Sequence, residues 1–86
     1  MYDVIMSPSA AAFYAAADQP LARKLARCFR NLRNDPRQGN NVKRLTGKWS
    51  AYLRYRVGDW RVIYRVDDEL KQVNVVDIAH RREVYD

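Results

Sequence analysis

This chain of 86 residues carries 16 Lys and Arg against 10 Asp and Glu, a formal charge of +6. Its length has room for one hydrophobic core, so we expect residues 1–86 to form a single domain. A hydrophobic fraction of 48% excludes a disordered basic tail. The charge favours a polyanion, either nucleic acid or an acidic protein. Nucleic acid is favoured because arginine is the commoner of the two basic residue types here, and its guanidinium both binds phosphate and stacks on nucleobases.

The cysteine and histidine content limits the possible chemistry. Cys28 is the only cysteine and His80 the only histidine, which excludes an internal disulfide and a structural zinc site. We therefore expect a site with no metal and no other cofactor. No apolar stretch has the length of a membrane span, and the alanine-rich N-terminus lacks the basic start of a secretory signal. The expected location is the reducing cytoplasm, away from membranes.

The first third of the chain predicts one strand and two helices. Residues 2–6 read as a short strand, after which Ser7 can cap a helix that has Pro8 in its first turn and runs to about Ala17. Residues 18–20 (Asp-Gln-Pro) break this helix and open the next. The second helix has an apolar stripe at spacings of three and four, which predicts that these residues are core: Leu21, Leu25, Cys28, Phe29 and Leu32.

The opposite face of the second helix is basic and is typical of a solvated helix surface. It carries Arg23, Lys24, Arg27, Arg30 and Arg33. The helix is expected to end near residues 34–36 (Asn-Asp-Pro), followed by a polar loop over residues 37–41.

Two β-rich runs then predict a hairpin. They span residues 51–57 and 60–66 and are joined by Gly58-Asp59, a two-residue turn in which glycine supplies the positive φ. A turn at residues 67–69 leads to a third run at residues 72–79. The order β-α-α-β-β-β predicts an α+β fold, with two N-terminal helices packed on one face of a mainly antiparallel four-stranded sheet.

The hairpin register predicts two chemically different faces, because opposed residues share a face. One face is expected to be core and collects Leu53, Tyr55, Val57, Trp60, Val62, Tyr64 and Val66. The other is basic and collects Tyr52, Arg54, Arg56, Arg61, Ile63 and Arg65. A half-buried sheet often has a polar outer face of no special function. Here, however, Arg56 and Arg61 are directly opposed without an acid on that face of the hairpin, which indicates an anion-binding surface.

The segment after the third run, residues 80–86 (HRREVYD), adds His80, two arginines and a tyrosine. A lone histidine is often structural, but in an exposed basic cluster His80 could also transfer a proton. Arginine stays protonated in water and acts mainly by holding phosphate.

The stretch VKRLTGKWSAYLRYRVGDWRVIYRVDD, followed by VVDIAHRREVYD, closely resembles the RelE/ParE superfamily of bacterial type II toxins. The likeness covers nearly the whole chain and implies a RelE-like fold. The terminal HRREVY looks like the RelE branch of messenger-RNA endonucleases, whereas ParE-type toxins, which poison DNA gyrase, generally lack that set.

The resemblance implies a ribosome-dependent endoribonuclease that inhibits translation by cleaving mRNA in the A site. By position, Arg54 and Arg56 match basic residues around the scissile phosphate, Arg61 a phosphate-binding arginine, Arg81 a general acid and Tyr85 a base-stacking tyrosine. Relatives often have lysine at the positions of Arg54 and Arg56, and arginine is the poorer proton acceptor. His80 could therefore take the proton-accepting role instead. Further RNA contacts are expected from Tyr52, Arg65, Lys48 and Arg82.

The expected chemistry is metal-independent attack by the substrate's own 2′-hydroxyl on the adjacent phosphate. Two alternatives remain: a ParE-like gyrase inhibitor that is no nuclease, and an inactive family member that only binds. By resemblance, the partners are mRNA, the ribosome and a RelB-like antitoxin, whose apolar and acidic segment would wrap the helices and sheet.

Overall fold

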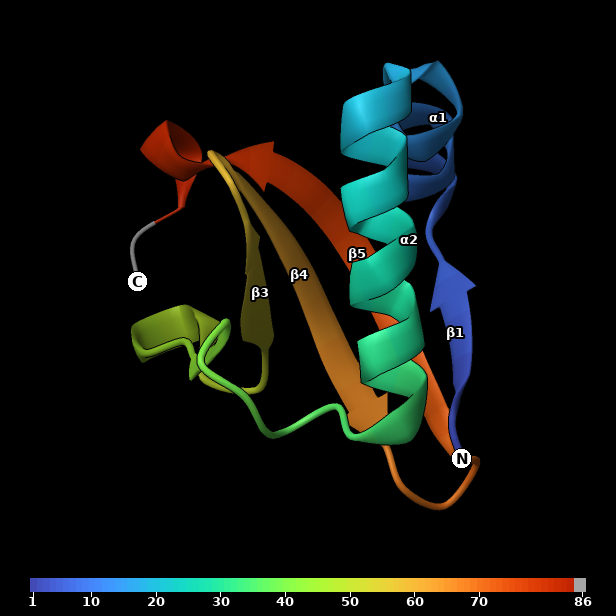
Figure 1. Ribbon diagram of the computed structural model, residues 1–86. Helices are drawn as coiled ribbons and strands as arrows, with labels where there is room; N and C mark the ends of the chain where they lie inside the picture. The colour runs from blue at the N-terminus through green and yellow to red at the C-terminus, as the bar shows by residue number, and fades with distance from the viewer. Residues whose placement is uncertain (85–86) are drawn as a thin grey trace.

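A curved sheet with helices on one side forms the fold (Figure 1). The computed structural model describes residues 1–84. In chain order the elements are β1 (Asp3–Met6), α1 (Pro8–Ala16), α2 (Gln19–Asn34), β2 (Val42–Arg44), the 3-10 turn η1 (Gly47–Trp49), β3 (Leu53–Val57), β4 (Trp60–Asp67), β5 (Gln72–His80) and the 3-10 turn η2 (Arg81–Glu83). The strands follow the order β1-β5-β4-β3-β2, with β1 parallel to β5 and the other pairs antiparallel.

The predicted α+β class is confirmed, but the sheet has five strands rather than four. The additional strand, β2, lies at the edge and pairs with β3 over only three residues. Two of these three residues are Lys43 and Arg44, so the segment shows no apolar alternation by which a strand is predicted. Charged side chains on a short edge strand also discourage pairing with another chain.

Both helix starts are fixed by side-chain caps, of which the one made by Ser7 was predicted. The Ser7 hydroxyl accepts a hydrogen bond from the Ala10 amide at 3.2 Å and donates one to the Val76 carbonyl at 2.9 Å, which ties α1 to β5. Asp18 accepts from the Leu21 amide at 3.0 Å and begins α2. A proline in the first turn of each helix agrees with these starts, because its missing amide has no helical partner there.

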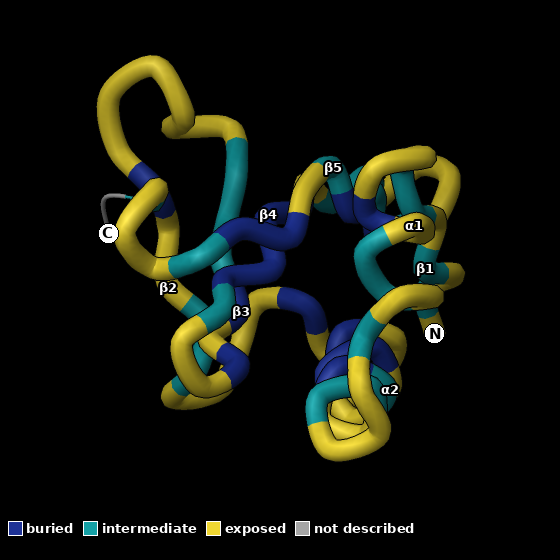
Figure 2. Tube along the Cα trace, turned by 90° about the horizontal axis from the view of Figure 1, so that it is seen from above, coloured by how far each residue is buried: buried dark blue, intermediate teal, exposed yellow. Residues whose placement is uncertain are grey.

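The predicted hairpin is confirmed in turn and register. Val57 pairs with Trp60 and Arg56 with Arg61, and Gly58 has a φ of +59°. The predicted inward residues therefore lie on the helix side of the sheet, where they meet α1 and α2. Seen from above, α2 lies on one side of the curved sheet with its buried residues turned toward the strands (Figure 2).

The core lies between the helices and this inner face of the sheet. Its buried members are Ala10, Leu25, Cys28, Phe29, Leu32, Tyr55, Val57, Val62, Tyr64, Val73, Val75 and Ile78. Tyr64 is fully buried, and its hydroxyl donates to the Pro36 carbonyl at 2.5 Å. Burial raises the pKa of the Cys28 thiol, because the thiolate would lose its hydration. Cys28 is thus a core residue, as predicted from its helical spacing.

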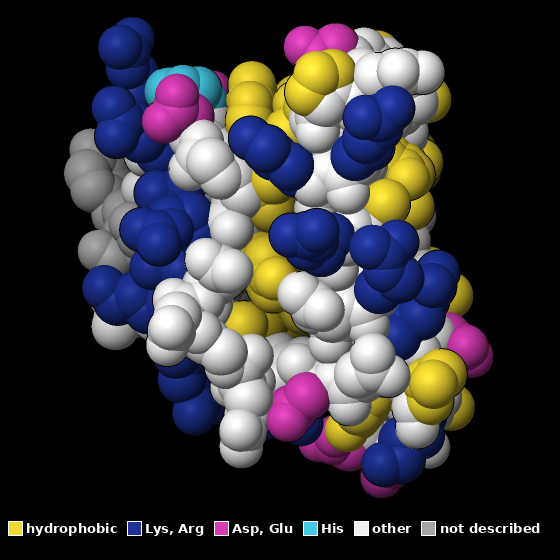
Figure 3. Space-filling model, in the orientation of Figure 1, with side chains coloured by type: hydrophobic (Ala, Val, Ile, Leu, Met, Phe, Trp, Pro, Cys, Tyr) yellow, Lys and Arg dark blue, Asp and Glu magenta, His cyan; other side chains and the backbone are white. Residues whose placement is uncertain are grey.

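The basic residues of α2 are all exposed, as predicted from their position opposite the apolar stripe. Figure 3 shows Lys and Arg side chains gathered over α2, separated by a hydrophobic strip from others along the left edge of the molecule. No helix among the described residues 1–84 combines the length and apolarity needed to cross a membrane.

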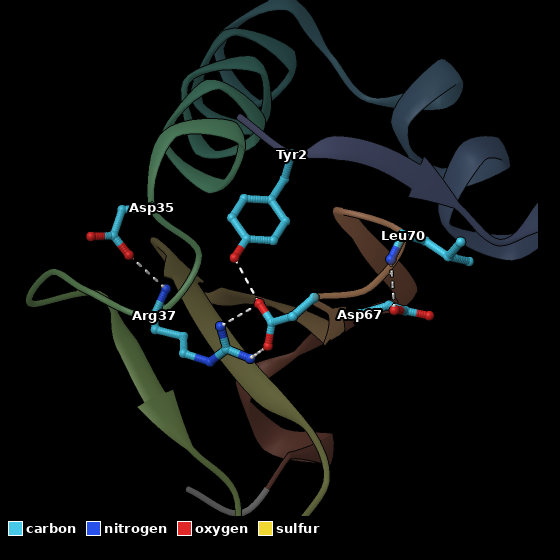
Figure 4. Close-up of polar contacts among 6 residues, drawn as sticks. Tyr2, Asp35, Arg37, Asp67 and Leu70 are labelled. Atoms are coloured by element: carbon cyan, nitrogen blue, oxygen red, sulfur yellow. Dashed lines mark hydrogen bonds and ion pairs between the residues drawn. The ribbon is translucent and has the colours of Figure 1, made fainter.

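A polar network fastens the end of the sheet remote from the hairpin turn (Figure 4). Arg37 donates two hydrogen bonds to the Asp68 carboxylate, at 3.1 and 2.9 Å, and the Tyr2 hydroxyl donates a third at 2.7 Å. These contacts join the loop after α2 to the β4–β5 turn and to the N-terminus. The Arg37 guanidinium and the Tyr2 hydroxyl hold the pKa of Asp68 below its ordinary value. Both partners of the ion pair are about half exposed, so the network orders loops more than it stabilises the fold.

Candidate nucleic-acid interface

The sheet face that points away from the helices, here called the outer face, gathers basic residues from three strands. Arg56 on β3 pairs with Arg61 on β4, and Arg54 on β3 pairs with Lys43 on β2. Residues paired in this way project from the same face. Lys43, Arg54, Arg56 and Arg61 therefore form one cationic cluster, of which sequence reasoning missed Lys43 because β2 was not predicted.

The spacing within the cationic cluster suits a phosphate group. Directly opposed residues have Cβ atoms about 4.5–5.5 Å apart, and the next residue on the same face is about 7 Å further along the strand. Arg54 donates to the Asn41 carbonyl at 2.6 Å, which directs its guanidinium toward β2. Like charges at such separations repel, and a bound anion relieves that repulsion.

Arg61 is the most constrained member of the cationic cluster. Its side chain is only 9% exposed, and its Nη1 donates to the carbonyls of Gly58 and Trp60, both at 3.0 Å. The sequence predicted an open basic face, whereas Arg61, Ile63 and Ala79 are all buried on it. The outer face is therefore partly covered, and the hairpin turn holds Arg61 in place.

An apolar groove of about 660 Å³ lies beside the cationic cluster on the outer face. Its apolar base includes Ile63 and Ala79, which are the cross-strand neighbours of Arg54 and Arg61 respectively. The remaining lining residues are Ser9, Leu45, Thr46, Lys48, Trp49, Tyr52, Val76, Asp77, Glu83 and Val84. A groove of this volume is within the range that holds small organic ligands.

One side of the groove is formed by η1 and the residues that follow it. Gly47 has a φ of +67°, a conformation that disfavours larger residues and lets the chain turn sharply. Trp49 is 48% exposed, and its ring lies 5.4 Å from that of Tyr52 at an interplanar angle of 67°. Lys48 and Tyr52, two predicted RNA-binding residues, both line the groove. Trp49 was not among the predicted site residues, although an aromatic in a Gly-Lys-Trp turn could have indicated it.

Two of the arginines predicted at the site meet at the hairpin turn. Arg61 contacts the Gly58 carbonyl, as described above, while the Arg81 amide donates to the Asp59 carbonyl at 2.8 Å. The Arg81 Nε also lies 3.6 Å from the Asp59 carboxylate. The turn thus brings η2 to the same end of the sheet as Arg61. Tyr85 lies outside the described residues.

His80 lies on the opposite face from the cationic cluster. It pairs with Trp60, which packs against Phe13 of α1, and the His80 and Trp60 ring centroids are 5.3 Å apart. Its Nδ1 accepts a hydrogen bond from the Arg82 amide at 3.3 Å and so caps η2. His80 is therefore half-buried against Trp60 and caps η2, whereas the sequence predicted it in an exposed basic cluster.

A β-bulge explains where His80 points. The β4–β5 register shifts between Ile63 and Tyr64, which pair with Asp77 and Val75, so Val76 is an extra residue on β5. An extra residue reverses the alternation beyond it. Asp77 and Ala79 thereby reach the outer face, and His80 turns to the inner one. Asp77 is thus an acid on the outer face, although the hairpin itself contributes none there.

The two remaining predicted RNA contacts, Arg65 and Arg82, are exposed. Arg65 pairs with Asn74 on the far side of Ile63 from Arg61, and Arg82 belongs to η2. Within residues 1–84, no group of three or more His, Cys, Asp or Glu side chains is placed to hold a metal ion.

Comparison with solved structures defines the class of fold. A YoeB/ParE toxin from Agrobacterium tumefaciens is 20% identical, with a TM-score of 0.81 over 91% of this chain and 96% of that one. The archaeal RelE of the RelE–RelB complex from Pyrococcus horikoshii OT3 is 23% identical, with a TM-score of 0.79 over 96% and 98%. The isolated RelE toxin of E. coli is 18% identical, with a TM-score of 0.78 over 93% and 84%. The fold is therefore RelE-like.

The family follows from the sequence itself. The family model for the ParE toxin of type II toxin–antitoxin systems (parDE) matches residues 4–85 of this sequence. The chain therefore belongs to this family within the RelE/ParE superfamily. A search of curated proteins finds no match. The resemblance seen in the hairpin and the C-terminal segment is thus confirmed at the level of the superfamily.

Proposed function

We propose that this toxin is an endoribonuclease that cleaves messenger RNA in the ribosomal A site and thereby stops translation. The observation that carries the proposal is the opposed pair Arg56 and Arg61, flanked by Arg54 and Lys43 and lying beside the groove. A phosphodiester at the cationic cluster would place its base over the apolar part of the outer face. The terminal HRREVY segment supports the same reading.

The reaction we propose uses the substrate's own nucleophile. The 2′-oxygen forms a bond to the adjacent phosphorus, the bond from phosphorus to the 5′-oxygen breaks, and the products are a 2′,3′-cyclic phosphate and a 5′-hydroxyl. The 2′-hydroxyl gives its proton to solvent, and the 5′-oxygen takes one from Arg81, which solvent then reprotonates. Arg54, Arg56 and Arg61 would stabilise the extra negative charge of the phosphorane, a contribution that is largest when the donors are fixed beforehand. Arg61, held by two carbonyls, meets that condition best.

Proton transfer is assigned to the C-terminal segment. We propose that Arg81, whose contacts with Asp59 hold it at the same end of the sheet as Arg61, would donate a proton to the leaving 5′-oxygen. Because His80 lies on the inner face and uses Nδ1 in a cap, we give it no part in the reaction. Tyr85 remains a proposed stacking residue by resemblance alone.

The proposed partner is an antitoxin of the RelB type, and the proposed location is the bacterial cytoplasm. The archaeal RelE noted above was solved in complex with RelB. In this chain the exposed arginines and lysine of α2 form a basic surface that an acidic antitoxin segment could neutralise. Such a partner would prevent cleavage by covering the groove or by displacing residues that line it.

A second candidate function is inhibition of DNA gyrase, and it is favoured by the match to the ParE family model. The two functions separate in one paired experiment with the purified toxin. We expect primer extension on programmed ribosomes to show new mRNA ends, while gyrase supercoiling proceeds unchanged at the same toxin concentration. Loss of supercoiling with intact mRNA would select the gyrase function instead. Absence of both effects would indicate a family member that only binds.

A further inference from the structure

The groove on the outer face has features of a subsite for a nucleobase. Its aromatic side is Trp49 and Tyr52, with Trp49 nearly half exposed although it is a large apolar residue. Exposed aromatic rings are the usual platforms on which unpaired RNA bases stack. Ile63 and Ala79, the cross-strand neighbours of Arg54 and Arg61, extend the apolar surface of the groove as far as the cationic cluster. A nucleotide whose phosphate met the cationic cluster would therefore have its base within reach of Trp49.

The charge of the groove indicates which part of the nucleotide it takes. Asp77 and Glu83 both line it, and both are exposed carboxylates. They disfavour a phosphate inside the groove, whereas the cationic cluster beside it favours one. A carboxylate accepts hydrogen bonds but donates none, so it recognises the exocyclic amino groups of adenine, cytosine and guanine. Uracil has no such amino group and offers only its N3–H as a donor on the base edge.

We infer that Trp49 stacks on one base of the bound RNA and that Asp77, with Glu83 as a second acceptor, selects a base with an exocyclic amino group over uracil. This inference rests on the proposed function, because it takes single-stranded RNA to be the ligand. It adds a determinant of sequence preference to a site whose cationic cluster reads only phosphate.

The test uses RNA that the toxin cannot cleave. Homotrimers of adenosine, cytidine, guanosine and uridine, with every 2′-hydroxyl methylated and a 5′ fluorophore, are titrated with the full-length toxin, and binding is followed by fluorescence anisotropy. We expect Trp49→Ala to weaken binding of the amino-bearing trimers by about tenfold or more, since stacking contributes on that scale. Trp49→Phe should restore most of the loss. Leu70→Ala, at an exposed apolar residue in the β4–β5 turn, is the matched control.

The selectivity is tested separately. The uridine trimer should bind the unaltered toxin about tenfold more weakly than the others, as expected for a lost base-edge contact. Asp77→Asn should narrow that gap, because an amide offers both a donor and an acceptor and can also bind uracil. Equal affinities for all four trimers would overturn the selection by Asp77.

The outcomes also separate this inference from the proposed function. Binding that depends on Trp49, in a toxin that cleaves no mRNA, would support the subsite and contradict the nuclease. Cleavage that proceeds normally with trimer binding unchanged by Trp49→Ala would overturn the subsite alone. If Trp49→Ala weakens binding of an antitoxin peptide but leaves binding of the trimers unchanged, the nucleobase subsite is overturned in favour of a protein ligand.

Discussion

Arg61→Ala is expected to lower the rate of mRNA cleavage on programmed ribosomes by about 10²–10³-fold, the usual effect of removing one fixed donor from a developing oxyanion. Arg61 is the member of the cationic cluster whose guanidinium is both buried and held by backbone carbonyls. Its loss therefore removes a prearranged charge that solvent cannot replace. Single-turnover kinetics with saturating toxin would measure the effect on the chemical step, and growth arrest on expression should be relieved in parallel.

The control variants separate catalysis from folding. Arg30→Ala removes an exposed arginine on α2, remote from the outer face, and should leave cleavage and thermal unfolding unchanged. Arg61→Lys keeps the positive charge but not the forked geometry, so it should recover only part of the rate. Full activity in Arg61→Ala, with an unaltered unfolding transition, would remove Arg61 from the phosphate site.

The second large effect concerns the core. Leu25→Ala is expected to lower the free energy of unfolding by about 2–5 kcal/mol, because Leu25 is fully buried where α2 packs on the sheet and its loss leaves a cavity. A domain of this size is only modestly stable, so the variant should be partly unfolded at growth temperature. Urea denaturation followed by circular dichroism measures the change.

Leu70→Ala provides the matched comparison for that experiment. Leu70 is 64% exposed, so the same truncation should alter the free energy of unfolding by no more than about 0.5 kcal/mol. Similar losses in both variants would contradict the assignment of Leu25 to the core.

The hairpin shows what could be predicted from sequence. Two apolar alternations flanking Gly58-Asp59 fix both turn and register, and register then decides the face of every residue. The opposition of Arg56 and Arg61 followed directly from this local pattern. The start of each helix was equally local, since Ser7 and Asp18 cap the helices that follow them.

The departures have non-local causes. The bulge at Val76 depends on how β5 pairs with β4, and it alone moves His80 to the inner face and Asp77 to the outer one. The burial of Arg61 depends on contacts made by the hairpin turn and on the cover over the outer face. β2 is a strand because β3 offers it an edge, and its own three residues carry little strand signal.

The measurement that tests the central claim most directly uses an mRNA with a single 2′-deoxynucleotide on the 5′ side of the mapped cleavage position. On programmed ribosomes, the unmodified message should yield fragments ending in a 2′,3′-cyclic phosphate and beginning with a 5′-hydroxyl. The deoxy message should stay intact at that position, because its nucleophile is missing. Cleavage of the deoxy message, or fragments that begin with a 5′-phosphate, would contradict an attack by the 2′-hydroxyl at the cationic cluster.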